Sequence, residues 1–199
     1  MRTSYIEPEV LERLRANMGG DEWLALWVAL ETGMRIGDIV LLRGWNLVRG
    51  KIEFTAQKTG KIGKMPVSKR LFAELSAKTS GKPSAWVFPS PVKVGQHITR
   101  QCVWQRVKRA CKRAGVDASG VAPHSFRKSF AVDLFKREGL EATREALQHD
   151  RASTTQIYAL SDFTSGSNGD KPLLRRDLPL IIAEVLAALP SKCTADHMV

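Results

Sequence analysis

The sequence predicts a mainly α-helical fold with a small antiparallel β-sheet, of the α+β class. Apolar residues recur at helical spacing along most of the chain, whereas one stretch, residues 51–67, alternates in the manner of a hairpin. A length of 199 residues, of which 43% are hydrophobic, suits one domain with a core of its own. We therefore expect a single helical domain that carries one hairpin.

Two helices are expected near the N-terminus, followed by a short third one. Apolar residues recur at helical spacing over 10–14 and again over 23–30, and Gly19 and Gly20 separate the two runs. The third helix should begin near Arg35, after a break at a glycine.

The alternating stretch contains the turn Lys-Thr-Gly-Lys at residues 58–61, between Ile52 and Phe54 on one side and Ile62 and Met65 on the other. A turn of this composition between two alternating runs is typical of a β-hairpin. Lys58 is therefore expected at the tip of the hairpin.

A longer helix is predicted from Thr99 to Ala114, with Thr99 as its cap and Gly115 as its stop. Basic side chains face away from the apolar stripe of this helix: Arg106, Lys108, Arg109, Lys112 and Arg113. Such a face is explained equally well by solvation and by contact with phosphate groups.

Further helices are expected over residues 124–138, 141–148 and 153–158, and Gly139 separates the first two. Residues 161–171 contain Ser, Gly, Asn and Asp with scarcely an apolar residue, which is typical of a flexible tether. Beyond the tether, an apolar stripe over 178–189 predicts a C-terminal helix that begins with Asp177 as its cap.

The charge of the chain favours a polyanionic partner, because 31 Lys and Arg against 20 Asp and Glu give a formal charge of +11. The N-terminal residues lack the order of a signal peptide and no apolar run is long enough to span a bilayer, so we expect a cytoplasmic protein without a membrane partner. The three cysteines have no paired spacing, and neither a disulfide framework, a metal site nor a cofactor is expected.

Arg127 stands out on the helix near 124–138, because a helical projection places it among Phe130, Ala131 and Leu134. An inward guanidinium is costly unless an anion or another acceptor meets it. Taken alone, a structural salt bridge would be the commoner explanation.

Two other short segments carry chemically capable groups. Arg35 follows Thr32-Gly33-Met34 at a helix junction, and Asp38 one turn later is placed to hold it. His149 precedes Tyr158 by nine residues across a predicted helix start.

Together and in this order, these segments resemble the tyrosine recombinases, also called the phage integrase family, over roughly residues 5–158. The resemblance implies the integrase catalytic-domain fold and six catalytic residues: Arg35, Lys58, His124, Arg127, His149 and Tyr158. The sequence departs from the family pattern at two positions. Gln148 precedes His149, where the family usually has Gly, and Lys128 follows Arg127, where family members often have His. The usual N-terminal DNA-clamping domain is absent, so the chain is either an excised catalytic domain or an arm-less recombinase.

The chemistry implied is metal- and ATP-independent strand exchange in double-stranded DNA. Two arginines and an imidazole stabilise charge on a phosphate, and the phenol of Tyr158 attacks it to form a 3′-phosphotyrosine. Lys58 acts as the general acid for the departing 5′-oxygen, and His124 assists proton handling. No small-molecule substrate is expected.

We expect a catalytic domain (1–160), a tether (161–176) and a C-terminal helix and tail (177–199). The resemblance implies a ring of four subunits on DNA. The apolar stripe of the C-terminal helix must be buried, either on a neighbouring protomer or in its own domain. Residues expected to contact DNA outside the catalytic set are Lys61, Lys64, Arg100, Arg106 and Lys128. A DNA-bound protein of this kind would be associated with the nucleoid.

The biological outcome stays open between integration, excision and inversion of a mobile element and the resolution of dimers. Two rival functions also remain. One is a type IB topoisomerase, which uses a similar set of residues to relax supercoils, and the other is a DNA-binding regulator without catalysis.

Overall fold

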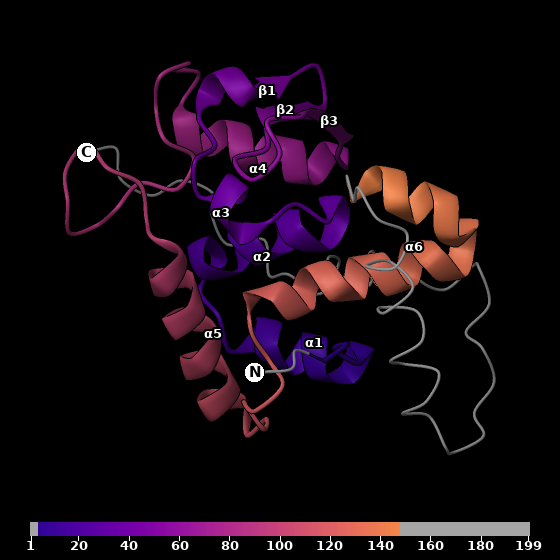
Figure 1. Ribbon diagram of the computed structural model, residues 1–199. Coiled ribbons are helices and arrows are strands. Elements are labelled where there is room, and N and C mark those ends of the chain that lie inside the picture. Colours follow the sequence, from indigo (N-terminus) through magenta and orange to yellow (C-terminus); the bar gives the residue numbers. More distant parts are fainter. Residues whose placement is uncertain (1–3, 148–199) are drawn as a thin grey trace. The chain divides into compact units, whose positions relative to one another are not determined.

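The computed structural model of the protein describes residues 4–147 (Figure 1). In chain order the helices and strands are α1 (Pro8–Ala16), α2 (Gly20–Thr32), α3 (Ile36–Ile39), the 3₁₀ turn η1 (Gly44–Asn46), β1 (Leu47–Val48), β2 (Lys51–Thr55), β3 (Ile62–Pro66), α4 (Lys69–Thr79), α5 (Arg100–Ala114) and α6 (Pro123–Ala146). This order confirms the predicted α+β class. None of the helices in this part of the chain is both long and apolar enough to cross a membrane.

Helix α2 forms the centre of the described part. Its residues from Trp23 to Ala29 are all buried, and it contacts α3, α4, α5 and α6 (Figure 1). The edge of the Trp23 ring meets Phe126 of α6 with 6.3 Å between ring centroids, a favourable aromatic geometry. A helix that is apolar nearly all round is expected in such a central position.

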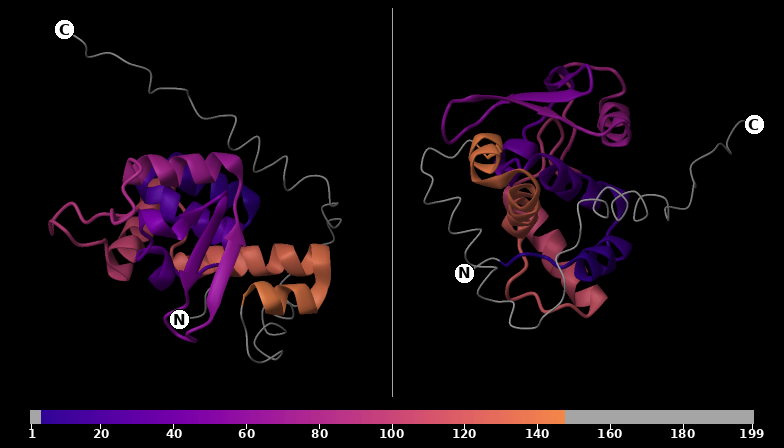
Figure 2. Two further views of the ribbon diagram at one scale, coloured as in Figure 1. Left: turned by 90° about the horizontal axis from the view of Figure 1, so that it is seen from above. Right: turned by 90° about the vertical axis from the view of Figure 1, so that its right-hand side faces the viewer.

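The three strands form one antiparallel sheet in the order β1-β2-β3, with Ile52 of β2 opposite Met65 of β3. The β2–β3 hairpin extends beyond the helices (Figure 2). Its turn closes through the backbone N–H of Ala56, which donates to the carbonyl of Lys61 over 2.9 Å. Lys58 lies in this turn, as the alternation predicted.

Helix α4 and strand β1 were not predicted from the sequence. The hydroxyl of Ser68 caps α4 by accepting from the N–H of Leu71, and Leu71 and Leu75 are buried. The backbone N–H and the hydroxyl of Ser68 both donate to the carboxylate of Glu31 on α2, each over 2.9 Å. The start of α4 therefore depends on a residue far away in the sequence.

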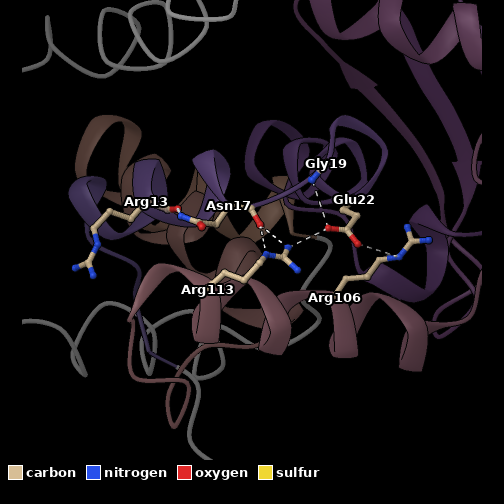
Figure 3. A network of polar contacts seen from close by, with 6 residues as sticks. All are labelled: Arg13, Asn17, Gly19, Glu22, Arg106 and Arg113. Atoms are coloured by element: carbon tan, nitrogen blue, oxygen red, sulfur yellow. Dashed lines mark hydrogen bonds and ion pairs between the residues drawn. The ribbon is translucent and has the colours of Figure 1, made fainter.

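The basic face of α5 is largely engaged in holding the fold together (Figure 3). Arg113 donates to the carbonyl of Asn17 over 2.9 Å and lies 3.4 Å from the Glu22 carboxylate, which Arg106 approaches to 4.0 Å. Lys108 donates to the carbonyl of Ala118. The contacts of Arg113 and Arg106 fasten α5 to the α1–α2 connection and to the first turn of α2. This structural use of the basic side chains was not among the two explanations that the sequence offered.

The two helical segments predicted on either side of Gly139 are present as the two arms of α6. Gly139 has φ 84° and ψ −172°, a conformation essentially restricted to glycine, and the helix bends there. Its second arm ends at Ala146, with Leu147 as a fully buried C-cap residue.

Gly33 ends α2 in the left-handed conformation, with φ 63°. A Cβ atom at this position would lie 2.4 Å from Cδ1 of Phe130 and 2.9 Å from Cδ2 of Leu147. The close approach of both arms of α6 to the end of α2 therefore requires glycine here.

Replacing Gly33 with alanine should lower the free energy of unfolding by about 2–4 kcal/mol, because backbone strain adds to a steric clash in the core. Chemical denaturation measures this loss. Gly20→Ala is the matched control, since nothing lies within 4 Å of a Cβ at this first position of α2. Equal stability of the two variants would contradict the assignment of Gly33 as a packing constraint.

Candidate active site

A cavity of about 430 Å³ lies where the start of α3, the hairpin turn and the first turns of α5 and α6 meet. Its lining residues are Arg35, Ile36, Gly37, Asp38, Gln57, Lys58, Arg100, Pro123, His124 and Arg127. The four predicted catalytic residues that lie within the described part of the chain thus surround one space. They come from three separate segments of the sequence.

Local structure explains how each segment delivers its side chain. The left-handed Gly33 turns the chain after α2, and Arg35 follows as the N-cap residue of α3. His124 and Arg127 stand three residues apart in the first turn of α6, a spacing that puts both on one face. The hairpin turn brings Lys58 to them from the sheet.

Arg127 is 5% exposed, so its charge is buried as the helical projection predicted. Its Nη1 donates to the carbonyl of Gly33, and its Nη2 donates to the carbonyl of Leu147 over 2.9 Å. The guanidinium therefore joins the end of α2 to the end of α6. These two carbonyl acceptors fix the guanidinium beside the cavity that it lines.

Asp38 is buried, but it does not hold Arg35 as the sequence suggested; no ion pair joins the two within the described residues. Its Oδ1 accepts the backbone N–H of Gln57 over 3.0 Å, and Gln57 directly precedes Lys58. Asp38 therefore fixes the hairpin turn against α3. Its negative charge also lies among the cations of the cavity, where it offsets part of their mutual repulsion.

The pKa of His124 lies below its usual value, first because the surrounding protein removes part of its water and second because Arg127 and Arg35 disfavour a further positive charge. The ring nevertheless keeps an exposed face. The lowered pKa favours the uncharged form of the imidazole at neutral pH.

The residues predicted to contact DNA outside the catalytic set occupy different surroundings. Arg100 lines the cavity, a position that the sequence alone gave no reason to expect. Lys61 and Lys64 line a separate cavity of about 920 Å³ between the hairpin and α6, and Lys64 lies 3.5 Å from the Glu53 carboxylate. Arg106 is paired with Glu22, and Lys128 is buried.

The remaining two predicted catalytic residues, His149 and Tyr158, lie outside the described residues, as do the predicted tether and C-terminal helix. Gln57 and Gly37 are parts of the cavity that sequence reasoning missed. Gln57 had a recognisable signal in its place beside Lys58, whereas Gly37 had none.

The described residues have the fold of integrase and recombinase catalytic domains. A DNA-bound dimer of lambda integrase matches 88% of this chain and 64% of its own, with a TM-score of 0.69 at 19% identity. The XerH recombinase in a post-cleavage complex matches 82% of this chain and 51% of its own, with a TM-score of 0.66 at 21% identity. The catalytic core of lambda integrase is covered to 93%, with a TM-score of 0.61.

The model of the phage integrase family matches residues 5–165, and the chain belongs to that family. The tyrosine recombinase XerD of Agrobacterium fabrum is 32% identical over 173 residues, which cover 76% of this chain and 50% of that protein. XerD of Vibrio cholerae is 31% identical over 137 residues, covering 64% of this chain and 45% of its own. The chain thus spans about half the length of these relatives.

Arg127→Ala should lower the free energy of unfolding by about 2–4 kcal/mol, because two buried carbonyl groups lose their donor. Arg35→Ala should change it by less than about 0.5 kcal/mol, since no hydrogen bond or ion pair engages Arg35 within the described residues. Urea denaturation of both variants measures the difference. A stable Arg127→Ala variant would show that the bonds to Gly33 and Leu147 contribute nothing to the fold.

Proposed function

We propose that the chain carries the catalytic domain of a site-specific DNA recombinase, which cleaves and rejoins DNA through a phosphotyrosine. The observation that supports this best is the cavity, where Arg35, Lys58, His124 and Arg127 lie together although they are distant in sequence. Membership of the phage integrase family and similarity to the XerD recombinases point the same way.

The reaction begins when the phenolic oxygen of Tyr158 attacks the phosphorus of one phosphodiester. Arg35 and Arg127 bind the nonbridging oxygens, whose negative charge grows in the transition state, and His149 adds a third donor. The bond from phosphorus to the 5′-oxygen breaks, leaving a 3′-phosphotyrosine and a free 5′-hydroxyl.

Proton transfer accompanies both bond changes. Lys58 gives a proton to the departing 5′-oxygen, and neutral His124 assists removal of the proton from Tyr158. The phosphotyrosine keeps the energy of the broken phosphodiester. The 5′-hydroxyl of a partner strand then attacks the phosphorus and releases Tyr158, without ATP.

The catalytic step is tested by trapping the covalent intermediate. Wild-type protein is incubated with a library of nicked duplexes of randomised sequence, in which cleavage releases a short 5′-hydroxyl fragment and prevents rejoining. A denaturation-resistant adduct is expected, and sequencing its DNA gives a cleavable site. Tyr158→Phe should form no adduct while binding the selected duplex as before, because only the nucleophilic oxygen is removed.

The absence of an adduct from the wild-type protein would favour a catalytically silent DNA-binding protein. An adduct that persists in Tyr158→Phe would show that another residue is the nucleophile. Relaxation of supercoiled DNA without any preferred sequence would favour the topoisomerase alternative.

The role of Lys58 has its own test. Lys58→Ala should slow cleavage of the selected duplex by about a hundredfold or more, and a 5′-thiol leaving group should restore it, because a thiolate departs without a proton. Lys51→Ala, at an exposed position on strand β2 of the same hairpin and outside the cavity lining, is the control and should leave cleavage nearly unchanged. Failure of the thiol to rescue Lys58→Ala, with DNA binding intact, would remove Lys58 from the acid role.

We further propose that the active form is an oligomer on DNA. Lambda integrase has been captured as a dimer on a core site and as a tetramer on a Holliday junction, and this chain shares its fold. The predicted helix over 178–189, on the tether that follows Tyr158, is suited to dock on a neighbouring protomer. Whether the outcome is integration, excision, inversion or resolution depends on the target site.

A further inference from the structure

The catalytic set does not account for every cation at the cavity. Arg100, the first residue of α5, also lines it. No hydrogen bond or ion pair engages this guanidinium among residues 4–147, unlike Arg106 and Arg113 further along the same helix, which are paired with Glu22. Arg100 therefore places a positive charge at the cavity that no acidic side chain among residues 4–147 pairs with.

The position of Arg100 is unfavourable for the fold itself. A cation in the first turn of a helix opposes the helix dipole, and α5 has no acidic residue in that turn to compensate. Thr99 already caps the helix by accepting from the N–H of Cys102 over 3.1 Å. The exposed Arg100 side chain makes no hydrogen bond or ion pair within residues 4–147, so an anionic ligand at the cavity would supply the compensating charge that the fold does not.

The backbone beside it is shaped for its approach. A Cβ atom on Gly37 would lie 3.3 Å from Cδ of Arg100, closer than such atoms usually come. The glycine in the first turns of α3 therefore lets the Arg100 side chain pass close to the backbone and reach the cavity. Arg35 lies two residues before this glycine and Asp38 directly after it, so Arg100 lies against the same segment that presents Arg35 to the cavity.

Charge matching decides what Arg100 binds. A single phosphodiester carries one negative charge, which Arg35 and Arg127 already meet with their paired donors. Along one strand of DNA the next charge follows after about 3.4 Å of helix axis, so a second phosphate always lies close to the first. A cation at the edge of the cavity is well suited to that neighbour.

We propose that Arg100 binds the phosphate next to the scissile phosphate on the same strand, and so determines which phosphodiester enters the cavity. Arg100 is thus a positioning residue that acts on the substrate outside the reacting atoms. The selection of one phosphodiester for cleavage rests on the proposed function. The binding of a phosphate by Arg100 rests only on the position of Arg100 at the cavity.

The test removes one phosphate charge at a time. In the duplex selected by covalent capture, a neutral methylphosphonate replaces the phosphate on either side of the scissile one. One of the two replacements should slow adduct formation by the wild-type protein roughly tenfold or more, the scale of one charge-assisted hydrogen bond. In Arg100→Ala the same replacement should have less than about a twofold effect, because the contact is already missing.

Arg109→Ala is the matched control, since Arg109 is exposed and lies nine residues further along α5, on the opposite face of the helix. It should remain as sensitive to the methylphosphonate as the wild-type protein. Arg100→Lys should recover part of the sensitivity, because it keeps the charge and loses the paired donors. The proposal is wrong if Arg100→Ala responds to a methylphosphonate at each of the two phosphates next to the scissile one as the wild-type protein does. It is also wrong if Arg100→Ala changes only which base sequence is cleaved.

A binding measurement separates this proposal from the proposed reaction. Arg100→Ala should reduce the slope of log affinity against log salt for a duplex by about 0.9, the contribution of one phosphate contact, whereas Arg109→Ala should not. Equal slopes for the two variants would overturn the assignment of Arg100 even if the wild-type protein forms an adduct. If no adduct forms and the slopes differ as expected, the catalytic proposal alone has failed.

Discussion

The buried guanidinium of Arg127 is the interaction on which the arrangement of the site depends. Removing such a group from water is costly, and the cost is recovered only if acceptors surround it. The carbonyls of Gly33 and Leu147 are two such acceptors, and both stand at helix ends, where carbonyl groups lack partners within their own helix. One side chain thereby satisfies two helix termini and fixes the distance between them. In the sequence, Arg35 follows Gly33 by two residues, and the predicted catalytic His149 follows Leu147 by two residues.

This arrangement gives Arg127 two functions that are difficult to separate. The bonds that hold Gly33 and Leu147 also orient the guanidinium, so it lines the cavity in a fixed position before any anion binds. The left-handed Gly33 serves both purposes, because it exposes its carbonyl to Arg127 and allows Phe130 and Leu147 to approach. A residue with a Cβ at this position would displace α6, and with it His124 and Arg127. Packing and site geometry are therefore set by the same few atoms.

Much of this could be predicted from the sequence, because local signals specify it. Thr99 and Gly115 mark the ends of α5 by cap chemistry, and Lys58 lies in a hairpin turn that alternation and glycine define. Helix α4 was missed although it has local signals, a serine cap at Ser68 and leucines at 71 and 75. Only the bond from Ser68 to Glu31, 37 residues away, leaves no trace in the local sequence. Asp38 was assigned to the wrong partner for a similar reason. Its neighbour in the sequence is Arg35, whereas its neighbour in space is the backbone of the hairpin turn.

The cations of α5 show how one basic helix divides its charge between structure and ligand. Sequence patterning does not reveal these uses. Arg106 and Arg113 belong to the basic face, whereas Arg100 lies three residues before Val103 and seven before Val107, on the side of the apolar stripe. The fold separates them, because Glu22 in the first turn of α2 pairs with Arg106 and Arg113 (Figure 3), whereas the first turn of α5 meets the cavity. A paired cation has already lost much of its water and gains little from a second anion. An unpaired one gains the full charge-assisted interaction. The formal charge of +11 therefore overstates the charge available to an anionic ligand, and along α5 it is pairing with Glu22 that distinguishes Arg106 and Arg113 from Arg100.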